Sequence, residues 1–116
     1  MKFESLSPFI PSGKDFEQSK KLFQALGFTI SWGGGDYVGF QSGNCQFILQ
    51  KFDDKHFAEN LMISVSVSSA DEFWQEVNAT EIAKKFGVRF SAPQKQPYGI
   101  EVNMIDLAGV CWHFVE

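Results

Sequence analysis

The chain has 116 residues, which is room for one domain, and its 44% hydrophobic and 21% charged residues are ordinary for a globular protein. A formal net charge of −4 argues against binding to nucleic acid, and no apolar run approaches the ~18 residues of a membrane-spanning helix. Two cysteines cannot form a disulfide framework, so we expect a cytoplasmic protein.

The first half of the chain predicts the element order β-α-β-β-β. Asp15 can cap a helix with Gln18 as its capping-box partner, and Gly27 can end that helix in a left-handed conformation. Apolar residues recur at helical spacing between these two signals. Strands are expected at residues 7–11, 28–32, 37–40 and 45–51.

The second half begins the same order again after a connecting segment at residues 53–60. The next residues alternate strictly, which places Met62 and Ser64 on one face of a strand and the aliphatic residues on the other. Ser69 opens a second helix, which breaks near residues 78–80. Further strands are expected at residues 88–91, 100–105 and 110–115.

The two halves also share a short residue pattern. Residues 43–50 and 109–116 both read Gly-x-Cys-x-aromatic-x-aliphatic-Gln/Glu, with His counted as aromatic, so that Phe47 corresponds to His113. Together with the repeated element order, this pattern favours a duplicated module. We expect a single domain, residues 1–116, with modules at about 5–52 and 61–116.

Two motifs near the ends of the chain carry a further signal. Asp15 opens a helix that closes on Leu26-Gly27-Phe28, and Asp106-Leu107-Ala108-Gly109 precedes the last strand. These motifs resemble those of glyoxalase/bleomycin-resistance domains of the vicinal oxygen chelate superfamily, although Leu107 stands where the family usually has Pro. The resemblance implies an α+β fold in which two βαβββ modules form curved mixed sheets with helices on the outer face.

The resemblance also implies where a metal ion would bind. Enzymes of the superfamily place metal ligands on the first and fourth strands of each module, and these positions fall near Ser7, Phe47, Met62 and His113. Only His113 is a good ligand for a divalent ion, because Phe and Met offer no hard donor atom. We therefore expect no metal, no cofactor and no catalytic residue, since the Lewis-acid chemistry of the enzymes has no centre here.

Aromatic residues form 16% of the chain, 13 of them Phe, which indicates a dense core, an aromatic-lined cavity or both. Any single ring is more readily explained as core, yet flat rings on curved sheets can also stack on planar or cationic ligands. On the resemblance, the expected ligand-binding residues are His113, Phe47, Trp32, Phe40, Tyr98, Met62 and Ser64.

The two histidines have different expected roles. Strand alternation places His113 with Cys111 on the face that would line the cavity of such a fold, where an imidazole can hydrogen-bond or exchange protons. The alternative is a histidine packed in a filled cup or at a dimer seam. His56 lies in a polar connector and is interpreted as part of a surface turn. Cys45 and Cys111 are interpreted as packing residues, because neither has a basic neighbour in the expected structure.

Three functions remain open from the sequence. The resemblance favours a metal-independent small-molecule-binding protein, similar to antibiotic-resistance proteins that sequester drugs, with the ligand in an aromatic-lined cup at a homodimer interface. The alternative is a lyase, isomerase or dioxygenase of the same superfamily with a non-standard site. The third is a protein-interaction module that uses the same sheet face.

Overall fold

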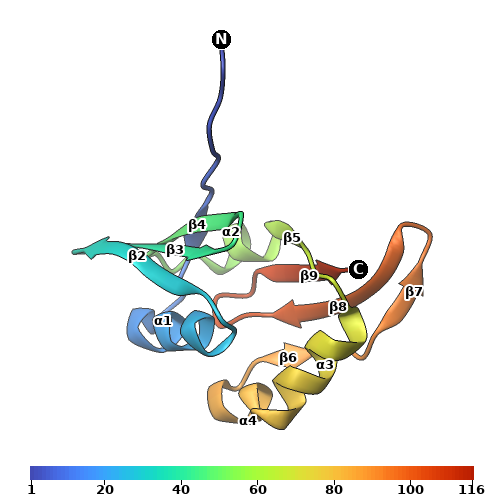
Figure 1. The fold of residues 1–116 in the computed structure, drawn as a ribbon. Helices are drawn as coiled ribbons and strands as arrows, with labels where there is room; N and C mark the ends of the chain where they lie inside the picture. Colours follow the sequence, from blue (N-terminus) through green and yellow to red (C-terminus); the bar gives the residue numbers. More distant parts are fainter. The chain divides into compact units, whose positions relative to one another are not determined.

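The computed structural model describes all residues from Met1 to Glu116, and the chain divides into two compact units, Met1–Asp53 and Asp54–Glu116 (Figure 1). The first unit has the order β-α-β-β-β, and the second repeats it with a second helix after its first strand and one additional strand, which confirms the predicted α+β fold with two βαβββ modules. The segment predicted to connect the modules contains a short helix, α2 (Lys55–Glu59), which belongs to the second unit.

The first unit is a four-stranded mixed sheet with one helix. In the strand order β1-β4-β3-β2, β1 runs parallel to β4 and the other pairs are antiparallel. Asp15 caps the helix as predicted, because its Oδ1 accepts a hydrogen bond from the backbone N–H of Gln18 at 3.1 Å. The elements are β1 (Phe9–Pro11), α1 (Phe16–Ala25), β2 (Thr29–Gly34), β3 (Tyr37–Ser42) and β4 (Cys45–Gln50).

The core of the first unit lies between α1 and one face of its sheet. The ring of Phe23 on α1 lies 5.9 Å from that of Phe40 and 4.9 Å from that of Phe47, measured between centroids. Phe40 and Phe47 are paired across β3 and β4, and their rings stack at 5.2 Å. Burying one such side chain contributes about 1.5–3 kcal/mol to folding, so these rings explain why this face holds the helix.

The second unit is a larger mixed sheet with its own helices. Strand β5 runs parallel to β9, which pairs with the antiparallel β8, and both β6 and β7 pair with β8. Ser69 caps α3 as predicted, since its Oγ accepts from the N–H of Glu72 at 3.1 Å. The elements after α2 are β5 (Met62–Ser66), α3 (Ala70–Ala79), α4 (Ile82–Phe86), β6 (Arg89–Phe90), β7 (Gln94–Gln96), β8 (Gly99–Ile105) and β9 (Cys111–Val115).

Helix α3 covers one face of this sheet. The ring of Phe73 stacks on that of Phe114 at a centroid distance of 4.2 Å, and Trp112 on the same side of β9 is buried. The predicted break in the helix is confirmed, because α3 ends at Ala79 and α4 begins at Ile82. The alternation of β5 is also confirmed: Met62 and the two serines that follow at alternate positions are exposed, while the residues between them are half-buried.

The turn between β8 and β9 explains the motif that begins at Asp106. One carboxylate oxygen, Oδ1, accepts hydrogen bonds from the backbone N–H groups of Ala108, Gly109 and Val110 at 2.9–3.0 Å, and Oδ2 accepts from Trp112 Nε1 at 2.9 Å. Burial raises the pKa of Asp106, while the hydrogen bonds from Trp112 and the amides act in the opposite direction. The carboxylate holds the hairpin in shape, and Leu107 is accommodated beside it.

Candidate functional site

Each sheet has one face that points away from the helix packed on it, which we call the distal face. In the second unit, the pairing of β5, β9 and β8 places Ser64, His113 and Asn103 in one row across this face. The neighbouring row contains Met62 and Cys111. Because side chains alternate along a strand, these residues share the side opposite Trp112 and the helix α3.

A hydrogen-bonded chain of four side chains crosses this distal face. Glu101 on β8 is 3% exposed, and its Oε1 accepts from His113 Nδ1 at 2.5 Å while its Oε2 accepts from the hydroxyl of Tyr98 at 3.0 Å. In the neutral imidazole whose Nδ1 proton is directed at the carboxylate, the lone pair is on Nε2. The Sγ of Cys111 lies 3.4 Å from that Nε2. We call Tyr98, Glu101, His113 and Cys111 the polar cluster.

The buried carboxylate shifts the acidity of two of its neighbours. The hydrogen bond to Glu101 raises the pKa of Tyr98, with burial and the negative charge of Glu101 acting in the same direction. Burial raises the pKa of the Cys111 thiol, and the charges of Glu101 and Asp106 raise it further. Cys111 therefore has a basic neighbour, His113, which the sequence analysis did not expect. The raised pKa of its thiol nevertheless favours the protonated form.

Asn103 adds an unusual group beside the polar cluster. Its side-chain Oδ1 is buried and has no hydrogen-bond partner. A buried acceptor without a partner costs on the order of 1–3 kcal/mol, and such groups are rare in folded proteins. The row of Ser64, His113 and Asn103 thus contains an unsatisfied acceptor next to an imidazole whose Nε2 has only a weak thiol donor as neighbour.

In the first unit, the distal face has a different character, because it is aromatic. Phe9, Trp32 and Tyr37 are 54%, 49% and 39% exposed, and the rings of Phe9 and Tyr37 meet edge to face at 6.0 Å. Trp32 pairs with Gly39 across β2 and β3, and a Cβ at Gly39 would overlap its indole ring. The glycine therefore makes room for the indole. We call Phe9, Trp32 and Tyr37 the aromatic platform.

Two of the expected binding residues do not reach a distal face. Phe40 and Phe47 are 1% and 4% exposed and contact α1 in the core, so neither ring can contact a ligand without unfolding the unit. The correspondence between Phe47 and His113 is also incorrect. Phe47 faces the helix of its unit while His113 faces away from its own, and a shift of one residue along a strand exchanges the two faces.

The other expected binding residues lie on or beside a distal face. Trp32 is in the aromatic platform, and the polar cluster brings His113 and Tyr98 together through Glu101. Met62 is exposed on the β5 edge beside Cys111, and Ser64 is exposed opposite His113.

The sequence interpretation missed Glu101 and Asn103, although a signal for both was present. The segment Ile100-Glu101-Val102-Asn103-Met104 alternates apolar and polar residues, which is typical of a strand with one buried face and one polar face. Reading that alternation places Glu101 and Asn103 on the same face. Their position opposite the last strand, and so beside His113, depends on a hairpin register that the sequence does not specify.

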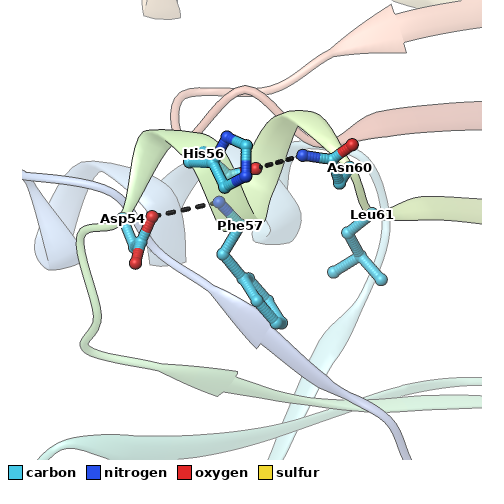
Figure 2. A pocket seen from close by; sticks show the side chains of 5 residues that line it. All are labelled: Asp54, His56, Phe57, Asn60 and Leu61. Carbon is cyan, nitrogen blue, oxygen red and sulfur yellow. Dashed lines mark hydrogen bonds between the residues drawn. The ribbon is translucent and has the colours of Figure 1, made fainter.

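A pocket around α2 contains the other histidine. Its lining residues are Asp54, His56, Phe57, Asn60 and Leu61, and Figure 2 shows the two polar side chains turned to the backbone. Asp54 accepts from the N–H of Phe57 at 3.0 Å, and Asn60 donates to the carbonyl of His56 at 2.7 Å. These side chains cap and close a helical turn, so the pocket has few polar groups left for a ligand.

No group of three or more His, Cys, Asp or Glu side chains is arranged to hold a metal ion. The polar cluster has one Glu, one His and one Cys, but Glu101 is engaged through both oxygens by Tyr98 and by the far nitrogen of His113. What this arrangement provides is a fixed imidazole with one nitrogen bonded to a buried carboxylate and the other next to a weak thiol donor.

Comparison with known proteins identifies the fold. No family model matches the chain, and no curated protein matches it. Among solved structures, a bleomycin-binding protein from bleomycin-producing Streptomyces verticillus, complexed with copper(II)-bleomycin, has a TM-score of 0.81 and 22% identity over 99% of this chain and 97% of that one.

Two further structures support the same conclusion. A bleomycin resistance determinant encoded on a transposon has a TM-score of 0.80 and 18% identity, with 98% of both chains covered. A hypothetical protein from S. aureus has a TM-score of 0.75 and 27% identity over 99% of this chain and 94% of that one. The chain therefore has the fold of the glyoxalase/bleomycin-resistance proteins in the vicinal oxygen chelate superfamily, as its end motifs predicted. None of its helices is long and apolar enough to cross a membrane.

Proposed function

We propose that this chain is a small-molecule-binding protein of the glyoxalase/bleomycin-resistance type, which binds its ligand on a distal sheet face without a metal ion. The aromatic platform is the observation that carries this proposal. Its three rings remain well exposed on a sheet whose other face has a complete core. Rings held on a sheet are rigid, so they can stack on a planar ligand at little cost in conformational entropy.

The polar cluster is a second candidate binding surface, which lies within the second unit. Small-molecule sites are mostly apolar but contain a few polar groups that fix the orientation of the ligand. His113 and Asn103 can serve in this way, because both have acceptor capacity that no strong protein donor uses. Two proteins with the same fold were solved with bleomycin bound, which supports a ligand of this general kind without identifying it.

We further propose that the protein is a cytoplasmic homodimer and that the ligand cup closes at the dimer interface. The exposed platform rings give a second chain an apolar surface to cover. Size-exclusion chromatography with light scattering at tens of micromolar checks this part, and a monomer at that concentration would contradict it.

A second function, enzymatic acid–base catalysis, is favoured by one observation. The buried carboxylate of Glu101 orients His113 through Nδ1 and leaves Nε2 as a base, which is the arrangement that catalytic histidines use. Solvent deuterium that enters a bound ligand with the wild type, and not with the His113→Gln variant, would favour a lyase or isomerase over a simple binding protein.

The Trp32→Ala variant tests the binding function. An aromatic dye such as anilinonaphthalene sulfonate should bind the wild type, and loss of the indole should raise its dissociation constant about tenfold, because aromatic anchors dominate such sites. Ile30→Ala is the matched control, since Ile30 lies on the same strand, is partly exposed, and faces the other side. Equal dye affinity of the two variants would contradict a binding role for the aromatic platform.

A further inference from the structure

The distal face of the second unit contains more acceptor than donor capacity. His113 Nε2 has its lone pair free of any strong donor, because its neighbour at 3.4 Å is the Cys111 thiol, which is a weak donor. Asn103 Oδ1 has no donor at all. The two residues are directly paired across β8 and β9, so their side chains are neighbours on this face.

The charge beside these acceptors is negative. Glu101 is two residues from Asn103 on β8, and its buried carboxylate is bonded to the His113 imidazole and the Tyr98 hydroxyl and to no Lys or Arg side chain. The carboxylate of Asp106 already accepts four hydrogen bonds at the turn between β8 and β9. Arg89 pairs with Ile105 in the row of Cys111, next to the row of His113 and Asn103, and is exposed on the edge strand β6.

One acceptor without a donor and one with only a weak thiol donor, both near a buried carboxylate, select for a particular partner. A neutral hydrogen-bond donor would satisfy the acceptors, but only a cationic donor would also be stabilised by the charge of Glu101, and charge-assisted hydrogen bonds are about twice as strong as neutral ones. The Asn103 oxygen is enclosed, so a compact N–H group fits better than a bulky donor. The soft χ2 torsion of Asn lets the amide turn toward it.

We propose that His113 Nε2 and Asn103 Oδ1, with the charge of Glu101 beside them, bind a compact cationic nitrogen group, an ammonium or amidinium, on the ligand. This inference rests on the proposed binding function and names the chemical class of the ligand. The cation donates its N–H groups to the two acceptors, and one of them takes the place of the Cys111 thiol at His113.

Benzamidine and benzamide are suitable probes, because they share size and shape and differ in charge. Titration of the ¹⁵N-labelled wild type near pH 7.5, followed by NMR, should give a dissociation constant at least about tenfold lower for benzamidine. In the Glu101→Gln variant that preference should disappear. Asp71→Asn removes the same charge from the exposed first turn of α3 and should keep the preference.

Equal affinities of the two probes for the wild type, or a preference that survives in Glu101→Gln, would overturn the inference, and the first of these comparisons needs no variant to fold. Absence of binding by both probes would overturn it as well. The proposed binding function stands or falls separately, on the response of dye binding to Trp32→Ala: dye binding that depends on Trp32, with no preference for benzamidine, would leave a small-molecule-binding protein without a cation site.

Discussion

Glu101 determines the chemistry of the polar cluster, because its buried carboxylate fixes His113 and raises the pKa of two neighbours. It accepts from His113 at 2.5 Å and from Tyr98 at 3.0 Å, and its negative charge is one of the causes that keep the Cys111 thiol protonated. A single side chain thus orients His113 through Nδ1 and adds to the effect of burial on the pKa of the neighbouring thiol.

The reactivity of Cys111 gives a test at this scale. Because burial and nearby negative charge raise its pKa above the ordinary value near 9.0, the alkylation rate with iodoacetamide should still be rising with pH above that value. In a Cys45→Ser background, Glu101→Gln should increase the rate at pH 8 by roughly threefold to tenfold, since less negative charge means more thiolate. Asp71→Asn should leave the rate unchanged.

A decrease of the alkylation rate in Glu101→Gln would contradict this account of Cys111. It would mean that the carboxylate acts mainly by orienting His113 as a base that deprotonates the Cys111 thiol. The thiol would then be an activated nucleophile. The measured direction therefore distinguishes a protonated packing thiol from an activated one.

Among the elements, strands β2 and β3 show how a glycine in the sequence makes room for a ring of the aromatic platform. Trp32 lies over Gly39, the position on the neighbouring strand where a Cβ would overlap the indole. Gly34 on β2 has a non-left-handed backbone and open space around its Cβ position. The two glycines therefore differ in one respect: a Cβ would overlap the Trp32 indole at Gly39 and would meet no other atom at Gly34.

Gly39→Ala should displace the Trp32 indole, while Gly34→Ala should not. The indole N–H signal of Trp32 should move in the NMR spectrum of Gly39→Ala, and dye affinity should fall toward that of Trp32→Ala. Because half of the indole is exposed, the ring can swing outward, and the cost to stability should stay within about 1–3 kcal/mol. Matching spectra and affinities for the two glycine variants would show that the indole does not depend on Gly39.

The sequence predicted the elements well but the faces only in part. Helix caps at Asp15 and Ser69 have local signals, and both helices begin where these residues indicate. The alternation of residues that predicted the two faces of β5 is also a local signal. The face of β9 was predicted by alternation and agrees with the structure, whereas Phe47 on β4 was matched to His113 through the residue pattern shared by the halves, and that match is out of step by one position.

For the whole molecule, the duplicated order and the two end motifs were sufficient to predict the fold. The motif at Asp106 works because a carboxylate that accepts four hydrogen bonds makes a hairpin nearly independent of the residues around it. The polar cluster was not predictable to the same degree. Tyr98 and Glu101 lie on one hairpin arm and His113 on the other, so their contact depends on tertiary register rather than on local sequence.

The most direct measurement of the central claim is a dye titration of the whole protein after EDTA treatment, repeated with Zn²⁺ and with Mn²⁺. The account predicts the same dissociation constant in all three conditions and the same melting temperature. A metal at about 100 times its dissociation constant would stabilise the fold by about 2.7 kcal/mol, which a melt detects readily. Dye binding that appears only with metal, together with a rise in melting temperature that EDTA reverses, would contradict metal-independent binding and favour a metalloenzyme.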